Sequence, residues 1–122
     1  MNKNKKWLDA FGHAFTGIRR TAARERNFRI QIIMGITAVA ACIILQVDTW
    51  HFLAVVLSIF FVLAMELVNT SIEAIIDLVC KNQIHPLAKI AKDAAAGAVL
   101  LASFQAIIVA LIVATSVIRR YM

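Results

Sequence analysis

Four polar side chains recur on one face of a mostly apolar segment, residues 50–80. They are Glu66, Asn69, Glu73 and Asp77. At 100° and 1.5 Å per residue they occupy an arc of about 80° over roughly 16 Å of helix. A charge inside a bilayer costs about 2.5–3.5 kcal/mol on insertion scales, so the three acids need a reason. We expect a site within the membrane or at its boundary. The alternative is a helix end that projects into the cytoplasm and is merely solvated.

Positive charge that could face these acids follows in the next apolar segment. Lys89, Lys92 and Asp93 share one face of the predicted helix, and small residues fill 94–98. The short connection at 81–86 makes the two helices antiparallel neighbours, and small residues allow their backbones to approach closely. We therefore expect the lysine face of one helix to meet the acidic face of the other at the membrane boundary.

Carboxylates without His or Cys partners favour a hard cation with oxygen ligands, which indicates Mg²⁺ rather than zinc. Mg²⁺ held by one or two carboxylates usually also binds substrate phosphates, which nearby lysines would neutralise. A further carboxylate could take the proton of an attacking hydroxyl. This chemistry is phosphoryl transfer from a water-soluble donor to a lipid alcohol. Any nucleotide site would be unconventional, because no Walker or kinase glycine-rich loop is formed by Gly12, Gly17, Gly35 and Gly97.

The composition is that of a membrane protein. The chain has 122 residues, of which 61% are hydrophobic and 16% are charged, whereas a soluble domain is about half apolar and a quarter charged. We expect a single membrane-embedded domain over residues 1–122. The net charge of +6 could indicate nucleic acid or anionic lipid. The cations lie in bands at 3–29, 81–92 and 119–120, which is typical of membrane flanks and argues against a nucleic-acid partner.

The hydropathy pattern predicts an all-α protein with four helices. Residues 4–23 place aromatic side chains on one side and cations on the other, as in a helix that lies on a membrane surface. Apolar runs then predict transmembrane helices at 28–47, 50–80 and 87–118. Three spans put the N-terminus and the second connection on one side, which holds eleven of the thirteen Lys and Arg residues. The positive-inside rule makes that side cytoplasmic.

Beyond these patterns, one long run of residues resembles a known family. The run is Glu66-Leu-Val-Asn69-Thr-Ser-Ile-Glu73-Ala-Ile-Ile-Asp77, followed by His85-Pro86 and Ala91-Lys92-Asp93-Ala-Ala-Ala-Gly97-Ala-Val-Leu100. Together with a Glu25-x-x-Phe28-Arg29 element, it resembles the bacterial integral-membrane diacylglycerol kinase family. The resemblance is closest to the undecaprenol kinase branch and covers essentially the whole chain.

The resemblance implies a homotrimer in the bacterial cytoplasmic membrane, with ATP as phosphoryl donor, Mg²⁺ as cofactor and active sites between subunits. Its catalytic base and reacting-centre asparagine fall on Glu66 and Asn69. Its metal ligands fall on Glu25 and Glu73, which also contact the nucleotide complex. The remaining nucleotide contacts fall on Asp77, Lys92, Asp93, His85 and His13. Besides Glu66, the positions expected near the lipid are Phe28, Arg29, Gln31 and Ala96.

The chain departs from the diacylglycerol-specific branch at positions near the lipid or the nucleotide. Gln31 stands where that branch has an acid, Ala96 replaces a serine, and the connection at 81–86 is about one residue longer. His85-Pro86 and the lysine-rich connection favour the polyprenol branch. We therefore expect phosphorylation of undecaprenol to undecaprenyl phosphate, with diacylglycerol as the alternative substrate.

Two other classes of protein are compatible with a small chain that carries acids in a membrane. A small proton-coupled transporter would place an acid near the bilayer centre and usually has four spans. An accessory membrane subunit would use the polar face only for helix assembly. Neither of these would incorporate phosphate into a lipid alcohol in the presence of ATP and Mg²⁺.

Overall fold

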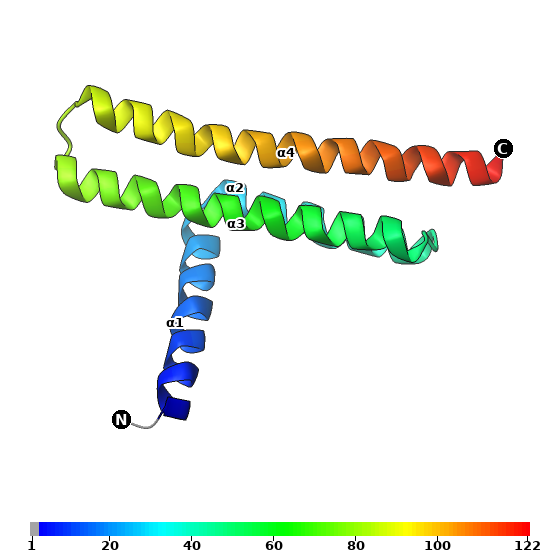
Figure 1. Cartoon of the computed structure of the whole chain (residues 1–122), viewed down its shortest axis with the longest axis horizontal. Coiled ribbons are helices and arrows are strands. Elements are labelled where there is room, and N and C mark those ends of the chain that lie inside the picture. The colour runs from blue at the N-terminus through cyan, green and yellow to red at the C-terminus, as the bar shows by residue number, and fades with distance from the viewer. Residues whose placement is uncertain (1–2) are drawn as a thin grey trace.

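The computed structural model describes residues 3–122 as four helices. They are α1 (Lys3–Arg24), α2 (Arg26–Ile44), α3 (Thr49–Cys80) and α4 (Pro86–Tyr121). Figure 1 shows α2, α3 and α4 running along a common direction, whereas α1 runs across them. Within the described residues there is no strand. The predicted class, an all-α membrane protein, is confirmed.

The three long helices are apolar enough to cross a membrane. The 19 residues of α2 span about 28 Å, which matches a hydrocarbon layer of about 30 Å. The 32 residues of α3 and the 36 residues of α4 are about 48 and 54 Å long, so both helices exceed that thickness. Because the length of α2 matches the hydrocarbon layer, the first residue of α2 is taken as the position of the membrane boundary.

The turn between α2 and α3 is fixed by the backbone. Gln46 adopts a left-handed conformation with φ 53°, and the N–H groups of Gln46 and Val47 donate to the carbonyls of Ile43 and Cys42. This pattern is a Schellman motif, which terminates a helix. It ends α2 at Ile44, three residues before the predicted end at 47.

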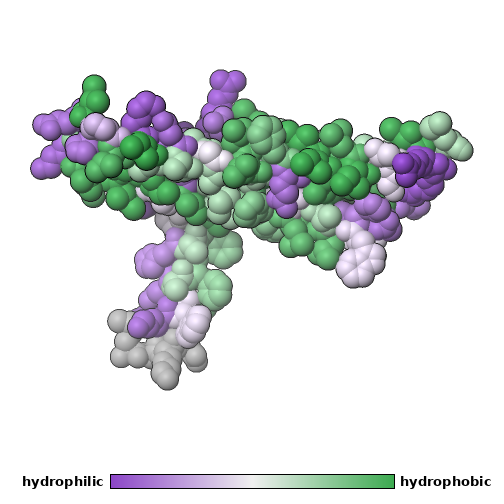
Figure 2. Space-filling view, turned by 45° about the horizontal axis from the view of Figure 1, so that its top comes forward, coloured by the Kyte–Doolittle hydropathy of each residue, from purple (hydrophilic) through white to green (hydrophobic). Residues whose placement is uncertain are grey.

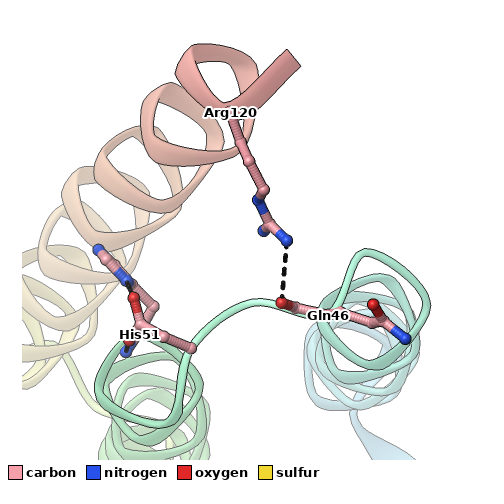
Figure 3. A network of polar contacts seen from close by, with 4 residues as sticks. Gln46, His51 and Arg120 are labelled. Atoms are coloured by element: carbon pink, nitrogen blue, oxygen red, sulfur yellow. Dashed lines mark hydrogen bonds and ion pairs between the residues drawn. The ribbon is translucent and has the colours of Figure 1, made fainter.

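Asp48 begins α3 as its N-cap, since its Oδ1 accepts the backbone N–H of His51 at 2.9 Å. That hydrogen bond is the main cause that lowers the pKa of the Asp48 carboxyl. Close by, the Arg120 guanidinium donates to the Gln46 carbonyl at 3.2 Å, as Figure 3 shows. The last turn of α4 is thus attached to the α2–α3 turn.

The packing places α3 in contact with both α2 and α4. Within the described part of the chain, the backbones of α2 and α4 do not approach each other closely, although Cys42 and Val113 belong to one buried cluster around Val55. Helices α2 and α4 border an apolar groove of about 620 Å³ over α3, and Gln31 lies among its lining residues. Figure 2 shows hydrophobic surface along the middle of the three helices and hydrophilic side chains at both ends. This distribution suits a protein surrounded by lipid.

Helices α2 and α3 approach each other closely at Gly35. A Cβ atom added there would lie 2.8 Å from Cγ2 of Ile59, so a side chain larger than hydrogen has no room. Small residues permit such close approach between membrane helices. The contact fixes the spacing of the two helices one turn away from Gln31.

Candidate active site

The acidic stripe of α3 runs from a position beside α2 to beyond the first residue of α2. Gln31 lies five residues into α2, about 7 Å inside its first residue, and its side chain contacts Glu66. Glu73 and Asp77 follow Glu66 by about 10 and 16 Å along α3, in the opposite direction. With α2 as the measure of depth, Glu66 lies inside the apolar layer. Glu73 lies at its edge, and Asp77 projects beyond it. The two alternatives, an embedded site and a projecting helix end, both stay predictions.

Glu66 is the most enclosed acid of the stripe, with a relative exposure of 6%. The Gln31 amide donates to its Oε2 at 3.4 Å, a long hydrogen bond. A buried carboxylate without a donor is strongly unfavourable, so this amide is an important neighbour. The Oε1 atom of Gln31 is buried and has no hydrogen-bond partner among the described residues. The Gln31 side chain therefore places polar atoms at one end of an apolar groove.

One turn further along α3, Asn69 orients Glu73. The Asn69 amide donates to Oε1 of Glu73 at 3.2 Å, while the Asn69 Oδ1 atom is buried and lacks a partner within residues 3–122. Buried oxygens are normally hydrogen-bonded, so an unpaired one often marks a position for a ligand, water or ion. Here the unpaired oxygen lies beside the Glu73 carboxylate.

At the projecting end, α3 and α4 are joined by charge. Lys92 Nζ donates to Oδ1 of Asp77 at 2.8 Å, so this lysine meets the acidic face as the helical pattern predicts. Lys89 instead pairs with Asp93 of its own helix at 2.7 Å. All four side chains are substantially exposed. Exposed pairs contribute little to stability, which leaves these groups free to exchange partners with a charged ligand.

Glu25 is the single non-helical residue between α1 and α2, with an extended backbone (φ −101°, ψ 113°) and a half-buried side chain. Phe28, one turn later, has a relative exposure of 1%. The expected lipid contact is therefore not available to it in this structure, because its ring packs inside the chain. Arg29 is exposed and donates to backbone carbonyls of α1.

Three further candidates are exposed residues. His85 is the N-cap of α4, and its Nδ1 accepts the Leu87 backbone N–H at 3.1 Å. The residue thus has a structural role at the turn beyond Asp77, whatever it does with a nucleotide. His13 is exposed on α1, about 18 Å before Glu25 along the helix. Ala96 is also exposed, and its neighbour Ala95 packs inside the chain.

The donor set fits a hard cation. Within residues 3–122 no group of three His, Cys, Asp or Glu side chains converges as a complete metal cage. Mg²⁺ does not need one, because it usually binds one or two carboxylates together with phosphate oxygens and water. The Glu73 carboxylate and the unpaired Asn69 oxygen beside it are oxygen donors of that kind.

Sequence reasoning missed two contacts of this region. Gln31 was expected to contact lipid, and its hydrogen bond to Glu66 was not anticipated. Arg29 was also assigned to lipid, whereas its guanidinium contacts α1. Both contacts join residues on different helices, and helical periodicity gives only the face on which a residue lies. The only available signal was that polar residues occur at these positions near the start of an apolar span.

The fold and the site together define a class of protein. It is a multi-pass membrane protein with carboxylates, an amide and a lysine along one helix pair at the membrane boundary. The family model for prokaryotic diacylglycerol kinase matches residues 12–114. The chain is 40% identical over 102 residues to a diacylglycerol kinase of Synechocystis, which is 84% of this chain and 58% of the relative. It is 34% identical over 112 residues to the undecaprenol kinase of Bacillus subtilis, which covers 92% and 90% of the two chains.

A diacylglycerol kinase of Escherichia coli is 31% identical over 101 residues, 83% of this chain and 82% of the relative. The chain belongs to the prokaryotic diacylglycerol kinase family. The class expected from the residues, a membrane lipid kinase, is thereby confirmed.

Proposed function

We propose that this lipid kinase transfers the γ-phosphoryl group of ATP to the hydroxyl group of undecaprenol, giving undecaprenyl phosphate and ADP. The lipid oxygen forms a bond to the γ-phosphorus, the bond from that phosphorus to the β–γ bridging oxygen breaks, and ADP leaves. The observation that carries the proposal is the enclosed Glu66 carboxylate, which meets Gln31 where that side chain lines the apolar groove. A base in that position could receive the proton of a hydroxyl at the end of a lipid chain.

The roles that we propose for the other residues are supported by their positions along α3 and α4. Asn69 holds the Glu73 carboxylate, and we propose that Glu73, with Glu25, binds Mg²⁺. When bound, Mg²⁺ neutralises charge on the phosphates. Asp77, Lys92 and Asp93 lie on the projecting part of α3 and α4, where a water-soluble nucleotide has access. Lys92 is suited to contact a phosphate, because it is a flexible cation in an exposed ion pair.

The groove supports a polyprenol as substrate. Besides Gln31, its polar lining side chains include Ser58 and Ser103. The hydroxyl groups of both serines donate to carbonyls of their own helices, so they are satisfied and the wall is effectively apolar. An isoprenoid chain has no ester groups and is compatible with such a wall. The similarity to the Bacillus undecaprenol kinase over nearly the full length of both chains also supports this substrate.

Diacylglycerol is the second candidate substrate, and phosphatidic acid would be its product. It is favoured by the 40% identity to the Synechocystis diacylglycerol kinase. We further propose that the chain works as a homotrimer in the bacterial cytoplasmic membrane with its N-terminus in the cytoplasm. Support for an assembly comes from the open groove and from α2 and α4, whose backbones do not approach each other closely within residues 3–122. A neighbouring subunit could complete the metal site through its Glu25.

The test compares undecaprenol and diacylglycerol side by side in one detergent, with purified protein and radiolabelled ATP. We expect Mg²⁺-dependent label in the lipid fraction and a higher kcat/KM for undecaprenol. Glu66→Gln should abolish turnover but retain nucleotide binding, because the shape is kept and the proton acceptor is lost. A higher kcat/KM for diacylglycerol would assign the second substrate. Absence of label with every lipid alcohol would refute the kinase proposal, and full turnover of Glu66→Gln would refute the role of Glu66.

A further inference from the structure

The C-terminus of α1 is held by a side chain of α2. The last carbonyl groups of a helix lack partners within the helix. In this chain, one guanidinium nitrogen of Arg29 donates to the carbonyls of Ala22 and Ala23, at 2.9 and 3.0 Å. Arg29 lies in the first turn of α2, so these two hydrogen bonds connect the end of one helix to the start of the next.

The chemistry of this contact suits arginine. A positive charge at a helix C-terminus is favourable because the carbonyl ends of the helix carry partial negative charge. Hydrogen bonds from an ionised donor are stronger than those between neutral groups. Lysine has the same charge but offers a compact, strongly hydrated ammonium group in place of a planar fork of donors. It would therefore replace this contact only in part.

The contact spans the bend at Glu25. The Glu25 N–H donates to the Thr21 carbonyl of α1 at 2.8 Å, and its carbonyl accepts the Arg29 N–H of α2 at 3.3 Å. Phe28 is almost fully buried and anchors the first turn of α2. The position of Glu25 is therefore set by the angle at which α1 leaves α2.

Most side chains of α1 contribute little to fixing the angle between α1 and α2. The apolar side chains of α1 are largely exposed, among them Trp7, Phe11 and Phe15. Figure 1 shows α1 extending away from the other helices. A helix with so few buried side chains takes its direction from its attachment point, which makes the Arg29 contact important.

We propose that Arg29 is a positioning residue, which clamps α1 across the three spans and thereby places Glu25 at the membrane boundary. The clamp itself is independent of the proposed function, whereas its effect on Mg²⁺-dependent turnover rests on that function. The clamp differs from the expected role of Arg29 as a lipid contact, because its guanidinium binds carbonyls of the chain itself.

The test uses Arg29→Ala and Arg29→Lys, with Arg26→Ala as the matched control. Arg26 is an exposed cation one turn earlier in α2, and its side chain makes no hydrogen bond within the described residues. In a Trp50→Phe background, Trp7 is the remaining tryptophan and reports the depth of α1. Its quenching is measured in vesicles that contain lipids brominated at known depths.

The clamp predicts that Arg29→Ala changes the Trp7 quenching profile, that Arg29→Lys restores it in part, and that Arg26→Ala leaves it unchanged. The Mg²⁺ concentration for half-maximal turnover should rise about fivefold in Arg29→Ala, the size expected when a cationic helix cap is lost. An unchanged Trp7 profile combined with a higher KM for the lipid would overturn the clamp in favour of a lipid contact. If the wild type had no kinase activity, the Trp7 profiles would still decide the question.

Discussion

Gly35→Ala probes the spacing between α2 and α3. The new Cβ atom would lie 2.8 Å from Cγ2, 3.6 Å from Cγ1 and 3.7 Å from Cδ1 of Ile59. Since comfortable carbon–carbon contacts are about 3.5–4.0 Å, the helices must separate locally by about 0.7 Å or more. Overpacking of this kind destabilises a folded protein by about 1–3 kcal/mol.

The same displacement should reach Glu66. Gln31 and Gly35 lie four residues apart, on one face of α2. The Gln31–Glu66 hydrogen bond is already 3.4 Å long, so an increase of about 0.7 Å exceeds the range of a hydrogen bond. A hydrogen bond to a charged group is worth about 1.5–3 kcal/mol, and half of the upper value corresponds to a factor of about ten. We therefore expect Gly35→Ala to lower both the thermal stability and kcat, the latter about tenfold.

Thermal unfolding in detergent and steady-state turnover measure the two effects. Gly17→Ala is the matched control, because no atom outside its own helix backbone lies within 4 Å of the added Cβ. Alanine is the better helix former by about 1 kcal/mol, so this control should be at least as stable as the wild type. The double variant Gly35→Ala/Ile59→Ala removes the clash and should be more stable than the sum of the single effects. Strict additivity, or a Gly35→Ala protein as stable as the wild type, would refute the close approach of the helices.

Two further predictions concern metal and pH. Glu73→Ala should raise the Mg²⁺ requirement for turnover or remove Mg²⁺ binding, as measured by metal titration of activity and of bound metal; an unchanged Mg²⁺ dependence would exclude Glu73 as a ligand. The lowered pKa of Asp48 means that its contribution to stability is full above the ordinary value of about 3.9 and is lost as the pH falls through the lower folded value. From about pH 5 to about pH 3 the wild type should lose more thermal stability than Asp48→Asn, which still caps the helix but does not titrate; equal losses would contradict this role.

The number and kind of helices could be predicted because the bilayer imposes a length on apolar segments. The end of α2 could not, since the Schellman motif depends on the left-handed conformation of Gln46, a residue with no strong preference for it. The positions of the acids relative to the other helices could not be predicted from the sequence either. The pattern of residues 50–80 shows that Glu66, Glu73 and Asp77 share a face, but only the pairing of Gln31 with Glu66 shows where they lie relative to α2.

The contacts of the candidate site could also be predicted only in part. Face angles and a short connection were sufficient to predict that Lys92 meets the acidic stripe, and the structure pairs it with Asp77. They did not distinguish Lys92 from Lys89, which pairs with Asp93, because that choice depends on the local distance between side chains. The same angles could not show that His85 caps α4, since a capping residue and a ligand-binding residue look alike in a sequence.

The acidic side chains of α3 become more exposed from Glu66 to Asp77. This order suits a reaction between a lipid in the membrane and a nucleotide in water. Glu66 is enclosed, Glu73 is half-buried and Asp77 is exposed. A lipid hydroxyl cannot leave the boundary of the membrane without exposing its chain, and a nucleotide cannot enter the apolar layer without losing the hydration of its phosphates. Transfer between them requires groups at successive depths on one rigid element, so that a base near the lipid and a metal ligand near the phosphates keep a fixed separation. A helix longer than the hydrocarbon layer, as α3 is, would provide that arrangement for the roles proposed for Glu66 and Glu73.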